Sequence, residues 1–243
     1  MSNDIRNVCL LGHGGSGKTS LAESMLYLTG GTDRLGRVPD GNTVCDSDPE
    51  EVKRQITIAL SVAPVTYNKT KINVINTPGY FDFAGEVVQA LAAADAGVIL
   101  CAAKGGLSVG AERAWKLLAG RRMPRLFYIS KTDEENGDFE ALLDELKAKY
   151  GTCICPLYAP IFGDHKRVLG IVDVITGKAY EAKGGKAAEI QAPPEAKALA
   201  ETYREALMEK VAESDEELME KFFDGAPFTE AEILKGIRAG VSD

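Results

Sequence analysis

The stretch Gly12-His13-Gly14-Gly15-Ser16-Gly17-Lys18-Thr19 lies between a short apolar run and a segment with apolar residues at helical spacing. Its glycines, its lysine and its hydroxyl residue match the pattern of a phosphate-binding loop. Glycines let the backbone turn so that successive N–H groups converge on a phosphate at the positive end of the following helix. A glycine-rich turn without a ligand is the alternative, but the complete pattern favours nucleotide binding. Lys18 is then expected to reach the outer phosphates, and Thr19 to ligate Mg²⁺.

The segments on either side of this loop support the same interpretation. The run from Ile5 to Leu11 suits a buried parallel strand, and Leu21, Met25 and Leu28 recur at helical spacing. This order predicts a strand, a loop and a helix that begins at Lys18. The dipole of such a helix points its positive end at the bound anion.

Length and composition predict a cytoplasmic globular enzyme. The 243 residues, of which 45% are hydrophobic, are enough for one large domain or for a domain with an insertion. The most apolar stretch, Ala90 to Ala103, is interrupted by Asp95 and is too short to span a bilayer, which argues against a membrane partner. The net charge of -8 argues against broad nonspecific binding of nucleic acid.

The five cysteines show no spacing typical of a disulfide framework or a zinc site. The pair Cys153 and Cys155 lacks the further ligands that zinc requires. We interpret the cysteines as reduced thiols that lie mostly in the core.

Strand and helix signals alternate along the first part of the chain, which predicts an α/β fold with a mostly parallel sheet and helices on both faces. In such a sheet, ligands bind at the carboxyl ends of the strands, where the phosphate loop falls. Two strands joined by a turn at Tyr67 to Lys69 are expected to form a hairpin. The predicted strands are 56–65, 71–75, 96–102 and 125–129, and the predicted helices are 83–94, 108–120 and 139–150.

The character of the sequence changes near Pro156. We therefore predict a nucleotide-binding core over residues 1–155 and an inserted α+β subdomain over residues 156–243. The subdomain is expected to contain strands at 158–162 and 169–174 around a polar turn, then a connection rich in Gly, Ala and Pro over 183–194, then charged helices over 195–239. The acidic run 213–220 is interpreted as a solvated helix face rather than a binding tail.

Three short segments, each placed near a predicted strand, narrow the kind of nucleotide site. In Asn76-Thr77-Pro78-Gly79, the N–H of Gly79 is placed to donate to a γ-phosphate, and Asn76 to hold a Mg²⁺-bound water. In Ser130-Lys131-Thr132-Asp133, the Asp133 carboxylate accepts from the two donors of a guanine edge. In Arg54-Gln55-Ile56-Thr57-Ile58, Thr57 is placed to cover the γ-phosphate and complete the Mg²⁺ shell. Each segment alone is equally compatible with an ordinary turn or strand residue, but their order and spacing favour function.

With these motifs, the chain resembles the translational GTPases and, among them, elongation factor G and its paralogues. The resemblance also covers Gly106 to Trp115 and Leu169 to Asp173, and the latter lies where elongation factor G carries an extra subdomain. It implies a P-loop GTPase fold that binds GTP or GDP with Mg²⁺. It implies that Thr19, Thr57 and Asn76 surround the metal. The implied partner of a full-length parent is the ribosome.

Four residues depart from the family pattern. Asn76 replaces an Asp and removes a negative charge beside the metal, so metal affinity should fall. Tyr80 replaces the His that positions the attacking water. With a reference pKa of about 10, a phenol stays protonated at neutral pH and cannot act as a base, but its hydroxyl can orient a water. Ser130 replaces the Asn of the guanine motif, and Gln55 replaces a Gly. These changes are compatible with nucleotide binding and put fast hydrolysis in question.

The candidate catalytic residues are therefore Lys18, Gly79 and Tyr80. One hypothesis is a GTPase that acts on the ribosome in translocation or in rescue or protection. The alternative is a pseudo-GTPase switch with little turnover, and a third is an ATP-using enzyme, against which Asp133 argues. The resembled family continues with a further strand and helix and with ribosome-contacting domains, so we expect the chain to be a truncated gene or a fragment. A natural protein without that strand is the alternative.

Overall fold

The computed structural model describes residues 4–134, 137–183 and 185–242. The chain folds into two compact units, Met1–Lys131 and Thr132–Asp243. The first unit ends at Lys131. That the nucleotide-binding core extends to residue 155 remains a prediction. No helix in the described part of the chain is long and apolar enough to cross a membrane.

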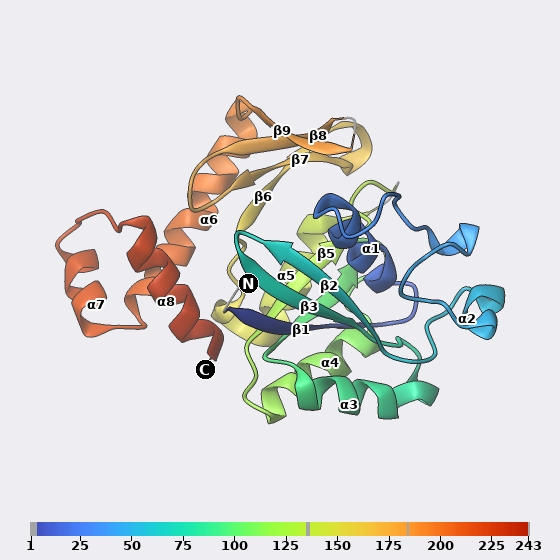
Figure 1. Cartoon of the computed structure of the whole chain (residues 1–243). Coiled ribbons are helices and arrows are strands. Elements are labelled where there is room, and N and C mark those ends of the chain that lie inside the picture. Colours follow the sequence, from blue (N-terminus) through green and yellow to red (C-terminus); the bar gives the residue numbers. More distant parts are fainter. Residues whose placement is uncertain (1–3, 135–136, 184, 243) are drawn as a thin grey trace. The chain divides into compact units, whose positions relative to one another are not determined.

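The first unit contains a five-stranded sheet in the order β2-β3-β1-β4-β5. Figure 1 labels β1, β2, β3 and β5 of this sheet. Strand β2 pairs antiparallel with β3, and the remaining pairs are parallel. The predicted α/β class is therefore confirmed. The strands are β1 (Ile5–Gly12), β2 (Ser61–Tyr67), β3 (Thr70–Asn76), β4 (Ala96–Ala102) and β5 (Arg125–Ser130).

Helices cover both faces of this sheet. Helix α1 lies on one face, and α3 and α4 lie on the other (Figure 1). Residues of β1 are buried in both directions: Leu10 packs with Leu26 of α1, while Leu11 faces the side of α3 and α4. A continuous apolar run is what a strand covered on both faces requires. The helices are α1 (Lys18–Leu28), α2 (Pro49–Arg54), α3 (Ala84–Ala93) and α4 (Val109–Gly120), with short 3₁₀ turns at Val38–Asp40 and Phe81–Phe83.

The hairpin of β2 and β3 is confirmed, but β2 begins later than predicted. Asn68 and Lys69 form its turn with φ of 46° and 65°, the left-handed conformation that suits a two-residue hairpin. The predicted strand over 56–65 is wrong in its first five residues. There the N–H groups of Ile58 and Ala59 donate to the buried carboxylate of Glu51 instead of to a neighbouring strand.

The second unit contains an antiparallel sheet in the order β6-β7-β8-β9 together with helices α5 to α8. Its core includes Ala159, Val172, Tyr203, Leu207 and Ile233. The strands are β6 (Tyr158–Phe162), β7 (Val168–Asp173), β8 (Ala179–Lys183) and β9 (Lys186–Ile190), and the helices are α5 (Phe139–Tyr150), α6 (Pro194–Ala212), α7 (Glu216–Phe223) and α8 (Glu230–Ser242), with 3₁₀ turns at Gly151–Cys153 and Asp164–Lys166.

The predicted connection over 183–194 is wrong, because it contains β9. This strand is rich in alanine, which has a low strand propensity. Its pairing with β8, in register from Ala179↔Ile190 to Lys183↔Lys186, satisfies its backbone and overrides the composition. The acidic run is confirmed as a solvated face, since Glu216, Glu217 and Glu220 are exposed and Leu218 turns into the core.

All five cysteines are free thiols. Cys9, Cys45 and Cys101 are buried, and Cys153 and Cys155 are exposed and half-buried. The described residues contain no group of three or more His, Cys, Asp or Glu side chains arranged to hold a metal. The prediction that the cysteines lie mostly in the core is therefore confirmed for Cys9, Cys45 and Cys101.

Candidate nucleotide-binding site

The glycine-rich loop joins the end of β1 to the start of α1, as predicted. Gly12, Gly15 and Gly17 have φ of 141°, 75° and 88°, a region that other residues rarely adopt. The Ser16 N–H donates to the His13 carbonyl at 3.2 Å and closes the turn. The loop and the first turn of α1 together present backbone N–H groups, a standard geometry for binding phosphate.

The ammonium of Lys18 lies inside this loop. Its Nζ donates to the carbonyls of Gly12 at 3.1 Å and of His13 at 2.8 Å. Burial lowers the pKa of Lys18 to about 8, and the nearby Asp46 carboxylate acts in the opposite direction. A buried ammonium held by two neutral carbonyls is well placed to receive an anion, because a phosphate compensates its charge.

An oxygen cluster lies beside the first turn of α1. The hydroxyl oxygens of Thr19 and Thr57 are 3.1 Å apart, and Thr57 donates to Asp46 Oδ1 at 2.8 Å. The Nδ2 of Asn76 donates to the Thr19 hydroxyl at 3.2 Å, while Asn76 Oδ1 is buried without a hydrogen-bond partner among the described residues. Two hydroxyls, a carboxylate and an amide oxygen fit a hard divalent cation such as Mg²⁺.

Asp46 is the functional candidate that the sequence did not single out. Its side chain is nearly buried, and burial is the main reason that its pKa is raised, with the charges of Glu51 and Glu23 adding to the effect. No local pattern marks it, because its place depends on the fold of the whole loop before α2. Asp46 supplies a carboxylate beside Thr57, whereas the side chain of Asn76 is a neutral amide.

Two buried carboxylates hold this loop in place. Glu23 Oε1, from α1, accepts from the N–H groups of Val44 and Cys45 at 2.7 and 2.9 Å. Glu51 Oε1, from α2, accepts from Ile58 and Ala59 at 2.9 and 3.1 Å. The first set fixes the residues before Asp46, and the second fixes those after Thr57. Both glutamates therefore position residues of the oxygen cluster, and neither lines the cavity beside the phosphate loop.

Glu51→Gln is expected to weaken nucleotide binding in the presence of magnesium about three- to tenfold. The neutral amide oxygen accepts weaker hydrogen bonds from Ile58 and Ala59, because charge-assisted bonds are worth roughly 1 kcal/mol more than neutral ones. The amide NH₂ would also face the Asp48 N–H, which in the wild type donates to Glu51 Oε2 at 3.1 Å. Fluorescent GDP titrations with magnesium chloride and with EDTA measure this.

The matched control for this experiment is Glu50→Gln on the same helix. Glu50 is exposed and pairs with Arg54 at 2.7 Å, a surface interaction of small value. Its replacement should leave the magnesium-dependent affinity within about twofold. An equal loss in both variants would show that Glu51 has no special role at the metal site.

A cavity of about 250 Å³ opens beside the loop and brings together most of the predicted site residues. It is lined by Gly14, Gly15, Gly17, Lys18, Thr19, Ser20, Val38, Asp46, Gln55, Ile56, Thr57, Gly79, Tyr80 and Lys131. Among the other predicted residues in the first unit, the carbonyl oxygens of Gly12 and His13 accept hydrogen bonds from Lys18. Asn76 lies in the oxygen cluster.

The predicted guanine motif begins at the end of β5. The Ser130 hydroxyl donates to the carbonyls of Ser16 at 2.7 Å and Cys101 at 3.2 Å. Ser130 thus ties the motif to the phosphate loop, which gives this departure from the family pattern a structural role. Lys131 has a φ of 56° and lines the cavity. Asp133 is exposed in the turn that opens the second unit.

Comparisons with known proteins agree with this geometry. Residues 3–234 match the family model of the elongation factor Tu GTP binding domain. A crystal structure of a protein from Thermus thermophilus is similar over 98% of this chain, with 38% sequence identity and a TM-score of 0.91.

The chain spans only 36% of that Thermus protein. The translation elongation factor SelB from Methanococcus maripaludis, solved with the GTP analogue GppNHp, matches 63% of this chain and 27% of its own. Its identity is 19% and its TM-score 0.47. The family match covers almost the whole chain, so this protein belongs to the family of the elongation factor Tu GTP-binding domain and is a GTP-binding domain of the translational GTPases.

Proposed function

We propose that this chain is the GTPase domain of an elongation-factor-G-like protein whose full-length form hydrolyses GTP on the ribosome. The buried Lys18 beside the Thr19, Thr57 and Asp46 oxygens is the observation that carries the proposal. Family membership supports the guanine nucleotide, and the additional unit after Lys131 supports the likeness to elongation factor G. Such a factor works in translocation or in the rescue or protection of ribosomes, in the cytoplasm.

In this proposal the polar residues around the phosphate loop have separate tasks. Lys18 binds the outer phosphates, and the loop N–H groups surround them at the positive end of α1. Thr19 and Thr57 would hold Mg²⁺, and the Asp46 carboxylate and the Asn76 amide oxygen would add acceptors beside it. When bound, Mg²⁺ neutralises charge on the phosphate oxygens. The Gly79 N–H donates to the γ-phosphate.

Tyr80 is the residue proposed to orient the attacking water. Its ring lines the cavity next to Gly79. A phenol hydroxyl can accept from or donate to a water but does not remove its proton at neutral pH. Catalysis then rests on positioning and on electrostatic stabilisation, which is the usual basis of phosphoryl transfer.

The pseudo-GTPase switch remains the second candidate, because Asn76 is neutral and Tyr80 is no base. Asp46 argues against it. Its carboxylate accepts from Thr57, so a negative charge is present at the metal site although position 76 lacks one. In the switch, GTP would order the residues around Thr57 without appreciable turnover.

Single-turnover GTP hydrolysis by the full-length parent, with and without ribosomes, tests the proposal. The double change Tyr80→His with Asn76→Asp is expected to speed hydrolysis on the ribosome at least about tenfold, equivalent to roughly 1.4 kcal/mol of barrier. The histidine provides a better water-positioning group, and the aspartate strengthens the hold on Mg²⁺.

Tyr67→His in the β2–β3 hairpin is the matched control, since Tyr67 is exposed and lies outside the cavity. It should leave the rate unchanged. A parent that already hydrolyses GTP as fast as the double variant would show that Tyr80 and Asn76 place the water in another way, and would rule out the pseudo-GTPase switch.

A further inference from the structure

The backbone of Gly79 presses against the phosphate loop. A Cβ atom at Gly79 would lie 2.5 Å from the Gly14 nitrogen and 2.6 Å from Lys18 Nζ. Both distances are far below van der Waals contact, so only glycine fits here. The Lys18 ammonium and the Gly79 Cα are therefore too close for a phosphoryl group to enter between them.

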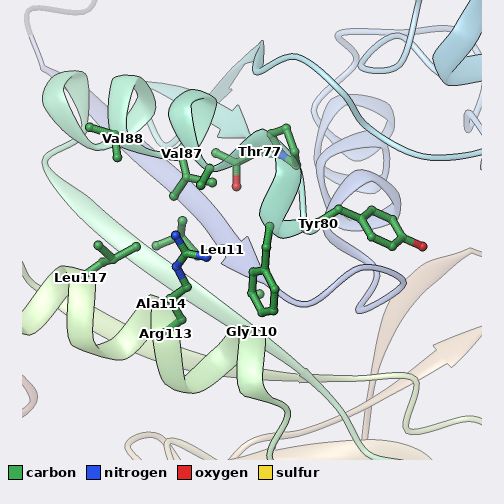
Figure 2. Close-up of a pocket in the computed structure, with 14 residues that line it drawn as sticks. Leu11, Thr77, Tyr80, Val87, Val88, Gly110, Arg113, Ala114 and Leu117 are labelled. Atoms are coloured by element: carbon green, nitrogen blue, oxygen red, sulfur yellow. The ribbon is translucent and has the colours of Figure 1, made fainter.

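The next residue, Tyr80, covers the same loop. A Cβ at Gly14 would lie 2.9 Å from Cζ of the Tyr80 ring, so the ring rests directly on this glycine. Figure 2 shows that Tyr80 points away from the other labelled side chains. Tyr80 is nevertheless 44% exposed.

Phe81 is held from two sides. The guanidinium of Arg113, on α4, lies 5.1 Å from the centre of the Phe81 ring, and the ring of His13, in the phosphate loop, lies 6.2 Å away in an edge-on arrangement. Arg113 points from α4 towards α3 in Figure 2. These contacts tie the segment of Gly79 to Phe81 to the loop and to α4.

The same segment is incompletely packed underneath. A cavity of about 60 Å³ lies between it, α3 and α4, lined among others by Leu11, Thr77, Val87 and Leu117 (Figure 2). A segment that borders an open pocket has fewer packing contacts to lose when it moves. The free energy needed to move Gly79 away from Lys18 thus depends mainly on the ring contacts of Tyr80 and Phe81.

We propose that Tyr80 is a specificity determinant for the length of the phosphate chain, and that its seat on Gly14, with the Arg113–Phe81 contact, makes this site favour a guanosine diphosphate over a triphosphate. The inference rests on the proposed nucleotide site. A diphosphate needs the loop N–H groups and Lys18, and Gly15, Gly17 and Lys18 already line the cavity beside the loop. A γ-phosphate needs the space between Lys18 and Gly79, and its binding must break the ring contacts first, which lowers the apparent affinity.

The test is the ratio of affinities for GDP and for a non-hydrolysable β,γ-imido GTP analogue, measured by titration calorimetry with magnesium. We expect the purified chain to bind GDP more tightly than the analogue. Tyr80→Ala should shift the ratio towards the triphosphate about three- to tenfold, as expected from the loss of one aromatic contact. Tyr67→Ala, at an exposed tyrosine of the hairpin, should shift nothing.

Two further variants keep the proposal testable if Tyr80→Ala folds poorly. Gly14→Ala places a methyl group where the ring lies and should displace it, and Arg113→Gln removes the cation–π contact. Both should shift the ratio in the same direction. An unchanged ratio in the variants that fold, or a wild-type chain that binds the triphosphate as tightly as GDP, would overturn the inference alone. Failure to bind either nucleotide would overturn the proposed function as well.

Discussion

Lys18→Ala is expected to abolish nucleotide binding, with a loss of at least about 100-fold in GDP affinity. Lys18 Nζ is the buried cation of the loop, and the carbonyl oxygens of Gly12 and His13 accept from it. A charge-assisted hydrogen bond to a phosphate contributes about 1.5–3 kcal/mol, and two such bonds exceed the roughly 2.7 kcal/mol that 100-fold requires. Titration calorimetry with GDP and magnesium measures the loss.

The control for this variant is Lys53→Ala, on α2. Lys53 is exposed, and its ammonium lies 3.9 Å from the Glu50 carboxylate, at the limit of an ion pair. This replacement should leave GDP affinity within about twofold. If Lys18→Ala bound GDP within tenfold of the wild type, the loop would not bind phosphate in the way described.

The pH dependence of binding provides a second signature of the same lysine. The pKa of Lys18 in the free chain is about 8, and a bound phosphate raises it, so binding takes up a proton above that pH. Affinity should therefore fall as the pH rises through 8, by about fourfold between pH 7 and 8.5. Lys18→Ala should lose this dependence together with most of its affinity.

The parallel sheet and the phosphate loop were predictable because their signals are local. The buried run before Gly12 and the helical spacing after Thr19 are complete within a few residues, and the ends of β1, β3 and β5 lie at one edge of the sheet because these strands are parallel to β4 or to one another. Asn76 and Lys131 thus came close to the loop as expected.

The Asp46 carboxylate of the candidate metal site could not be predicted, because its position depends on contacts between residues far apart in the sequence. The N–H groups of Val44 and Cys45 donate to Glu23 of α1, and these bonds fix the loop in which Asp46 accepts from Thr57. The N–H groups of Ile58 and Ala59 likewise donate to Glu51 and not to a neighbouring strand, so β2 begins later than predicted. At Ile58 and Ala59, hydrogen bonds to a buried carboxylate thus override the local strand propensity.

Asp133→Asn is expected to lower GDP affinity by at least about 100-fold and to favour xanthosine diphosphate in its place. The carboxylate is proposed to accept from guanine N1–H and the exocyclic amine, two charge-assisted bonds of about 1.5–3 kcal/mol each. An asparagine still accepts from N1–H, but its NH₂ opposes the guanine amine and instead donates to the C2 carbonyl of xanthine.

The position of the motif supports this prediction. Ser130 is anchored to the Ser16 carbonyl and Lys131 lines the cavity, and Asp133 follows them after one residue, in a turn that leaves its carboxylate exposed. Competition titrations with GDP, xanthosine diphosphate and ADP separate the outcomes, with Asp164→Asn in the polar turn of the second unit as the control. A wild-type chain that binds ADP as tightly as GDP would show that Asp133 does not read the base, and would restore the ATP-using enzyme as the better hypothesis.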